Sequence, residues 1–225
     1  FVHFEILIFV HFKFIIYKRY RFHLIGTVII AVCWLLSFNY IFQNAVREQL
    51  VHQEDERLGL EMEINSVINT YEEFGTYIFE QVINTPEILS VVEEAGRSDE
   101  EKQNVLRDTL YDLLKSDYDR LLLYHFKQLQ FHFSNGDSFL RFNEPDKYGD
   151  NLLSLRDSIR IVNTEKKPVF GFEAGRVFNG YRLVFPLIYQ GHHVGSAELA
   201  LSLNGVTELL QDTYPENNII YILKK

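Results

Sequence analysis

Cysteine is almost absent from this chain of 225 residues, which excludes one common way of holding a fold together. The single cysteine, Cys33, lies in an apolar run, so no disulfide can form within one chain. Common enzyme signatures are also missing, because the sequence has no GxSxG, no glycine-rich phosphate loop and no HExxH. The carboxylates of the first amphipathic segment are spread along its polar side, as on a solvated face. We therefore expect no enzyme activity within this chain.

Positive charge is scarce as well, with 22 Lys and Arg against 31 Asp and Glu and a formal net charge of −9. Four of the basic residues but only one acidic residue precede Asn44, so the rest of the chain is clearly acidic. This excess argues against nucleic acid as a partner. His192 and His193 are a weak metal signal, because neighbouring residues of a strand point to opposite faces and no cysteine supports them. We expect neither a metal site nor a cofactor.

One long hydrophobic run is present, from Leu24 to Phe42, without a charged residue. Its length is close to the roughly 20 residues that a helix needs to cross a bilayer, so we predict a transmembrane helix over residues 21–44. Basic residues precede the run and acidic residues follow it, which predicts a cytoplasmic N-terminal flank. Residues after about 44 are then extracytoplasmic.

Residues 1–20 form an apolar and aromatic segment interrupted by Glu5, Lys13 and two histidines. It fits an upstream membrane segment, an interfacial helix or sequence that is not native to the mature protein, and it stays unassigned. The chain begins with Phe1 and its only methionine is Met62, so we expect it to be a fragment of a longer protein.

Residues 45–124 are predicted to be helical. Apolar residues recur at three- and four-residue spacing from Ala45 to Ile83, which indicates one long amphipathic helix. Thr85 and Pro86 are typical of an N-cap and a first helical position. A capping box is expected at Ser98, with Glu101 reaching back, at the start of a third helix.

The apolar period changes to two after Tyr124, and residues 125–205 contain five strand signals separated by turn residues. A polar link after the second strand could hold a short helix within residues 152–162. The order of elements predicts an α+β fold, in which a transmembrane helix continues into a long amphipathic helix packed on a five-stranded antiparallel sheet, with helices on one side. Residues 206–225 are expected to start a following segment, for which a second module is one interpretation.

The segment "LQFHFSNGDSFLRF", residues 129–142, is typical of a β-hairpin around Asn135-Gly136. A two-residue loop pairs Gln130 with Arg141 and Phe131 with Leu140. The same loop pairs His132 with Phe139 and Phe133 with Ser138. The apolar face would pack on the long helix, whereas the face bearing Gln130, His132 and Arg141 is either solvated or lines a pocket.

The stretches "LQFHFSNGDSFLRFNEPDKYGDNLLSLR" and "KKPVFGFEAGRVFNGYRLVFPLIYQGHHVGSAELALSL" resemble extracytoplasmic Cache domains, which are PAS-like, and specifically a double Cache subgroup found on histidine kinases, diguanylate cyclases and chemoreceptors. The resemblance covers about residue 45 to the C-terminus. It implies a bacterial inner-membrane receptor that binds a small ligand on the sheet face opposite the long helix. It further implies that the link arches over this face.

The candidate ligand contacts on this face, its link and its later strands are Gln130, His132, Arg141, Tyr148, Arg156, Glu173, Arg176 and Arg182. Arginine presents a planar fork that suits a carboxylate, and a nearby Glu or Asp can hold an amine. The alternative for Glu173, Arg176 and Arg182 is that they join strands as ion pairs. His132 is equally compatible with a structural hydrogen-bonding role.

The sequence thus predicts a membrane-anchored sensor input domain that binds an amino acid, an amine or an organic acid. Ligand binding would favour one arrangement of pocket and helix, and a homodimer formed through the long helix would pass this change to a cytoplasmic output module outside this chain. A non-sensory extracellular interaction or adhesion domain is the alternative. An adhesive domain should expose an apolar patch, whereas a sensor should enclose a pocket with a polar centre.

Overall fold

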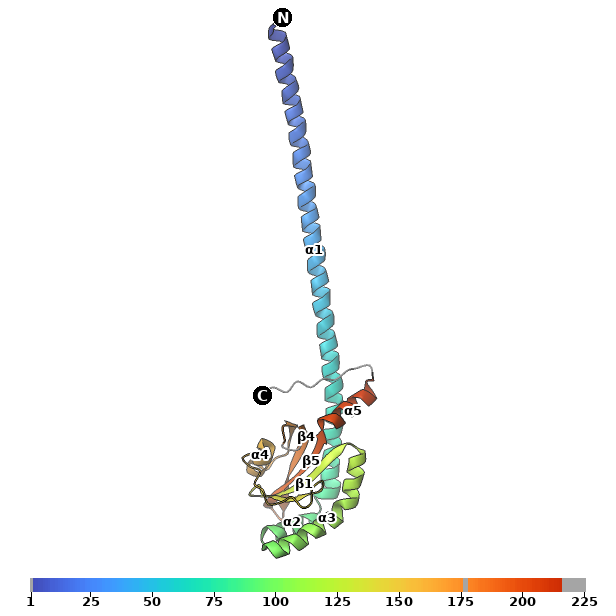
Figure 1. Ribbon diagram of the computed structural model, residues 1–225, viewed down its shortest axis with the longest axis vertical. Coiled ribbons are helices and arrows are strands. Elements are labelled where there is room, and N and C mark those ends of the chain that lie inside the picture. The colour runs from blue at the N-terminus through green and yellow to red at the C-terminus, as the bar shows by residue number, and fades with distance from the viewer. Residues whose placement is uncertain (1, 176–177, 216–225) are drawn as a thin grey trace. The chain divides into compact units, whose positions relative to one another are not determined.

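The computed structural model describes residues 2–175 and 178–215 (Figure 1). Contacts divide the chain into two units, Phe1–Glu61 and Met62–Lys225. In chain order, the first helical elements are α1 (Val2–Ile78), a π-helical turn (Phe79–Ile83), α2 (Pro86–Gly96) and α3 (Glu100–Leu123). They are followed by β1 (Phe126–Phe133), β2 (Ser138–Arg141), α4 (Asp157–Glu165), β3 (Val169–Glu173), β4 (Gly180–Tyr189), β5 (His192–Ser202) and α5 (Leu203–Thr213).

The described part of the first unit is the segment of α1 up to Glu61, and it contains the predicted transmembrane run. Within the described residues, one helix is long and apolar enough to cross a membrane. The side chains of Trp34, Phe38 and Phe42 stack along it at i,i+4 spacing, with ring centroids 5.7 and 6.4 Å apart. Large apolar side chains of the run are exposed, as expected for a segment whose solvent is lipid.

Local signals set the starts of α2 and α3. Thr85 caps α2 as predicted, accepting a hydrogen bond from the Ile88 amide at 3.4 Å, and Pro86 is the first helical residue. The predicted capping box at Ser98 is wrong by one residue. Asp99 caps α3 by accepting from the Lys102 amide at 3.0 Å, whereas the Ser98 hydroxyl donates to the Glu94 carbonyl in the last turn of α2. Asp and Ser are comparable caps, so the preceding helix decides between them.

The five strands form one antiparallel sheet in the order β2-β1-β5-β4-β3, which confirms the predicted α+β class. Its first face packs on the helices. Phe79 stacks on Phe185 with centroids 4.3 Å apart, and Phe126 contacts the rings of Tyr71 and Phe74 at 5.9 and 6.0 Å. The apolar residues predicted for this face lie in the same core: Leu129, Phe131, Phe133, Leu140 and Phe142.

The second face of the sheet carries α4 and the preceding segment, residues 143–156, which we call the link (Figure 1). The prediction that helices lie on one side is therefore incomplete. Ile159 and Val162 of α4 are fully buried but lie outside the main core, and Asn163 donates to Ser196 on β5 at 3.3 Å. The short helix begins at Asp157, later than the start of the predicted window.

The β1–β2 hairpin differs from the two-residue loop predicted for it. The Phe133 amide donates to the Asp137 carbonyl and the Gly136 amide donates to the Phe133 carbonyl, both at 2.9 Å, so the loop has three residues and Gly136 adopts φ 82°. His132 consequently pairs with Ser138, not with Phe139. A bulge then restores the predicted pairs of Phe131 with Leu140 and Gln130 with Arg141. Phe139 contacts Phe133 with centroids 4.7 Å apart, so it does not accompany His132.

Candidate ligand-binding site

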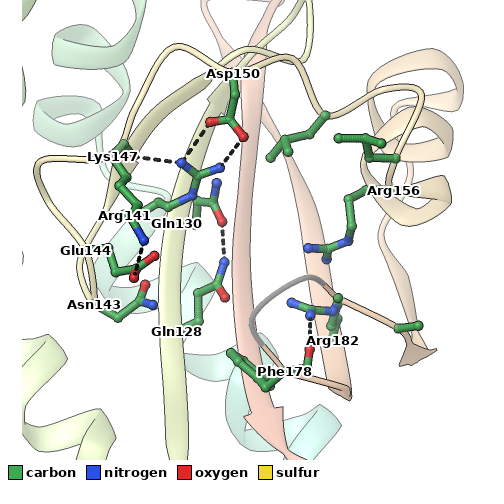
Figure 2. Close-up of a pocket in the computed structure, with 14 residues that line it drawn as sticks. Gln128, Gln130, Arg141, Asn143, Glu144, Lys147, Asp150, Arg156, Phe178 and Arg182 are labelled. Carbon is green, nitrogen blue, oxygen red and sulfur yellow. Dashed lines mark hydrogen bonds and ion pairs between the residues drawn. The ribbon is translucent and has the colours of Figure 1, made fainter.

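A cavity of about 460 Å³, which we call the first cavity, lies over the second face of the sheet and beside the link (Figure 2). Its volume falls within the range of about 300–1,000 Å³ typical of small-molecule sites. It is lined by Gln128, Gln130, Arg141, Asn143, Glu144, Lys147, Asp150, Leu152, Leu155, Arg156, Ala174, Gly175, Phe178 and Arg182. The wall is thus cationic and amide-rich, with apolar patches from the link and from Phe178.

A glycine makes room for Arg182. A Cβ atom at Gly175 would overlap Nη2 of Arg182, and it would lie 2.5 Å from the Phe178 carbonyl oxygen. Nη2 of Arg182 donates to that carbonyl at 3.0 Å, and the guanidinium carbon lies 5.0 Å from the centroid of the Phe178 ring. The turn before β4 therefore fixes this arginine from two sides.

Two carboxylates, one buried and one partly buried, hold the arginines of the first cavity. Glu198 of β5 is fully buried, accepts from Nη1 of Arg182 and accepts from Nη2 of Arg156 at 3.0 and 3.1 Å. Glu173 of β3 accepts from Nε of Arg156 at 2.5 Å and from the Ser158 hydroxyl at 2.8 Å. The network ties the end of the link to three strands.

The electrostatics of this network favour the charged forms. Burial alone would raise the pKa of Glu198, but the positive charges of Arg182 and Arg156 hold that pKa below its ordinary value. The pKa of Arg156 is raised despite burial, because Glu198 and Glu173 stabilise its charge. Nη1 of Arg156 makes no hydrogen bond with the described residues, so part of this guanidinium remains available.

Two further ion pairs lie on the opposite wall of the first cavity. Arg141 of β2 lies 2.8 Å from a carboxylate oxygen of Asp150 and donates to the Lys147 carbonyl at 2.8 Å. Lys147 pairs with Glu144 at 2.7 Å. Both lining carboxylates, Glu144 and Asp150, thus lie on this side, and Arg156 and Arg182 lie on the other, so a ligand with both charges would meet complementary groups (Figure 2).

The chain has matches among known protein families and solved structures. The family described as "Double sensory domain of two-component sensor kinase" matches residues 52–225. The chain belongs to this family. Its membership confirms the resemblance to double Cache sensors on which the sequence interpretation drew. No curated protein matches the chain significantly.

Several solved sensor domains are similar to this double sensory domain. The DcuS sensor domain of E. coli has a TM-score of 0.49 at 12% identity, covering 67% of this chain and 99% of that one. The ligand-binding domain of the Campylobacter jejuni chemoreceptor Tlp3, solved with 4-methylisoleucine, has a TM-score of 0.46 at 12% identity, covering 65% of this chain and 58% of that one. The V. cholerae histidine kinase DctB sensor domain has a TM-score of 0.44 at 14% identity, with coverages of 66% and 59%. The chain thus spans less than three fifths of the Tlp3 and DctB domains.

Four of the residues predicted from sequence line the first cavity of the double sensory domain: Gln130, Arg141, Arg156 and Arg182. Gln130 accepts from the Gln128 amide and donates to the Ser138 hydroxyl at 3.0 Å. Glu173 lies behind Arg156 and takes part in the interstrand ion pairs that the alternative reading described.

His132, Tyr148 and Arg176 are placed differently. His132 is on the cavity face of the sheet but is fully buried, with Nδ1 3.1 Å from the Ser196 hydroxyl, and it does not line the first cavity. Burial lowers the pKa of His132 to about 4. Tyr148 lies against Arg107, whose guanidinium carbon is 3.5 Å from its ring centroid. Arg176 lies outside the described residues.

Sequence reasoning missed Glu198, which is central to the site. A signal was present, because Glu198 is the one charged residue in the apolar strand "HVGSAELALSL" after its histidine, and a buried carboxylate needs a partner. Arg107 on α3 was missed too. Its helix reads as amphipathic, and nothing local distinguishes this arginine from the solvated ones around it. Within the described residues, no group of three or more His, Cys, Asp or Glu could hold a metal ion.

Proposed function

We propose that this chain is a membrane-anchored extracytoplasmic receptor module that binds a small ligand in the first cavity. The observation that carries the proposal is the first cavity itself, in which Glu198 and Glu173 fix an arginine network while Nη1 of Arg156 makes no hydrogen bond with the described residues. A guanidinium that is held rigidly and still has an unused N–H donor is suited to binding a planar anionic group.

The charges of the residues that line the first cavity indicate the class of ligand. Of an amino acid, an amine and an organic acid, a ligand with a carboxylate fits best, because Arg156 can bind that group. Glu144 and Asp150 on the other wall suit the ammonium group of an amino acid. Leu152, Leu155 and Phe178 supply apolar surface for a side chain.

The membrane anchor is the apolar run of α1, and its basic N-terminal flank supports a cytoplasmic start in the bacterial inner membrane. Signal transmission would follow from differential affinity. A ligand that bridges the link and the sheet stabilises one arrangement of these elements, and the core joins the sheet to the C-terminal part of α1 through Tyr71, Phe74 and Phe126. The output module lies outside this chain.

Association as a homodimer is part of the same proposal. Val46, Leu50 and Leu60 are exposed and share one side of α1, which gives it an apolar surface that suits a parallel helix pair. Disulfide crosslinking of an Ala45→Cys variant in membranes, in a Cys33→Ser background, tests it. Failure to crosslink at this and neighbouring positions contradicts the dimer.

A thermal-shift screen of the full chain in detergent tests ligand binding. We expect one or more amino acids or organic acids to raise the unfolding midpoint in a concentration-dependent way, whereas simple amines should have little effect. Arg141→Gln alters the first cavity, and Arg160→Gln is the matched control because Arg160 lies on the exposed side of α4, paired with Asp157. Binding in the first cavity should protect residues 150–156 from hydrogen exchange, because four of these residues line it. This protection should be lost in the first variant and kept in the second. A ligand that still protects residues 150–156 in Arg141→Gln contradicts this site.

A further inference from the structure

A second cavity of about 500 Å³ lies on the α3 side of the β1–β2 turn. Its walls come from the end of α2, one face of α3, the hairpin loop and the link, and its chemistry-bearing residues are Glu100, Gln103, Arg107, Asp137 and Tyr148. The link separates it from the first cavity. Lys147 and Asp150 line the first cavity, and Tyr148 and Gly149 line the second.

Arg107 is the central group of the second cavity. Its side chain is only 7% exposed and lies between two aromatic rings, 3.5 Å from the Tyr148 centroid and 5.4 Å from that of Phe139. Nε donates to the Phe139 carbonyl at 2.7 Å, and Nη1 donates to the Asn104 side chain at 2.5 Å. The guanidinium is therefore fixed in position before any ligand arrives.

Arg107 differs from the other cations of this unit's cavities. Arg141, Arg156, Arg182 and Lys147 each have a carboxylate partner. Arg107 has none within the described residues, and its Nη2 makes no hydrogen bond there. Burial lowers its pKa, and the nearby carboxylates of Asp108 and Glu100 only partly offset this cost.

A buried guanidinium without a counterion is uncommon, because removing its charge from water is unfavourable unless a partner is supplied. A structural role alone would be served by a smaller neutral donor to the Phe139 carbonyl. The remaining edge of Arg107 borders a cavity large enough for a small molecule, so a bound anion would complete the arrangement seen around the other arginines.

We propose that the second cavity is a binding site for a small molecule with a single carboxylate group, held by Arg107 and covered by Tyr148. Glu100 and Asp137 line the same cavity, so they repel dicarboxylates and tricarboxylates and accept an ammonium group if the ligand carries one. Simple monocarboxylates and zwitterions are thus the ligand class. The site is independent of the first cavity and does not require the function proposed for it.

The test uses the full chain in detergent with sodium acetate and glycine as probes, and with sodium chloride and trisodium citrate at matched ionic strength as references. Thermal unfolding is followed by circular dichroism, and hydrogen exchange is measured on peptides that cover residues 96–110 and 144–150. We expect acetate and glycine, but not chloride or citrate, to raise the midpoint and to protect both peptides.

Arg107→Met is the decisive variant. It should abolish the protection of residues 96–110 by acetate and glycine while leaving the midpoint without probe unchanged or higher, because an unpaired buried charge has been replaced by an apolar side chain. Arg141→Gln should keep the protection of residues 96–110, which separates the second cavity from the first. If Arg107→Met retains this protection, the proposal is wrong. If Arg107→Met does not fold, hydrogen exchange of the unaltered chain becomes the test. If acetate and glycine protect neither peptide in that chain, the proposal is wrong.

Discussion

Arg182 on β4 and Glu198 on β5 form an ion pair within the sheet, with side chains only 2% and 0% exposed. Arg156 approaches the same carboxylate from the end of the link, at 3.0 Å. The pair thus joins two strands and also anchors the segment that walls the first cavity. A buried pair of this kind contributes mainly through the penalty of breaking it.

Replacing Glu198 by Gln should lower the free energy of unfolding by about 3–5 kcal/mol, because two buried guanidinium groups lose their counterion. Urea unfolding measures the change. Glu198→Leu combined with Arg182→Met should cost less than the sum of these two single changes, which gives a favourable coupling energy in a double-mutant cycle. Additive single and double changes would contradict a direct pair.

The Glu198 carboxylate also predicts that the free energy of unfolding decreases at acidic pH. Because the pKa of Glu198 is lower in the folded than in the unfolded chain, its contribution is present above the unfolded pKa near 4.5 and is lost as pH falls toward the folded pKa. Urea midpoints measured below pH 5 should therefore fall less steeply for Glu198→Gln than for the unaltered chain. If the urea midpoints of the two chains fall with the same slope, a lowered pKa of Glu198 in the folded chain is contradicted.

His132 predicts a separate pH dependence at higher pH. Burial lowers its pKa to about 4 from an ordinary 6.5, so the unfolded chain takes up a proton more readily and stability falls as pH drops from 6.5 toward 4. The loss amounts to roughly 3 kcal/mol over this window. His132→Gln should flatten urea midpoints measured between these pH values. His52→Gln, on the exposed part of α1, is the control and should leave the slope unchanged.

The two faces of the hairpin predict opposite mutant behaviour. Phe131→Ala should cost around 3–5 kcal/mol of unfolding free energy, because it empties a fully buried position in the helix-packed core. Arg141→Ala should cost less than about 1 kcal/mol, because its partner Asp150 is largely solvated. Its effect should instead be loss of the ligand-induced protection of residues 150–156 from hydrogen exchange. A harmless Phe131→Ala together with an unfolded Arg141→Ala would mean that the faces are reversed.

Membrane topology is tested by cysteine accessibility. In a Cys33→Ser background, a membrane-impermeant maleimide added from outside should label Gln53→Cys and not Lys18→Cys, because basic flanks stay in the cytoplasm. Labelling in inverted vesicles should show the opposite pattern. The reverse result in both preparations would contradict the extracytoplasmic sensor.

The sequence alone was sufficient where a local pattern has one structural solution. The uncharged run from Leu24 to Phe42 predicted a long apolar helix, Thr85 and Pro86 predicted the start of α2, and the alternation of Leu129 and Phe131 predicted the core face of β1. Each of these depends on a period or a cap within a few residues.

Only the tertiary structure decided which polar residues meet. The three-residue loop and its bulge moved Phe139 away from His132, a one-residue change of register that alternation cannot detect. Glu198 joins Arg156 and Arg182 from sequence distances of 42 and 16 residues. Tyr148 turns to Arg107, on the other side of the link from the first cavity. Charge pairing depends on which elements are brought together by burial of the core, and that long-range arrangement has no local signature.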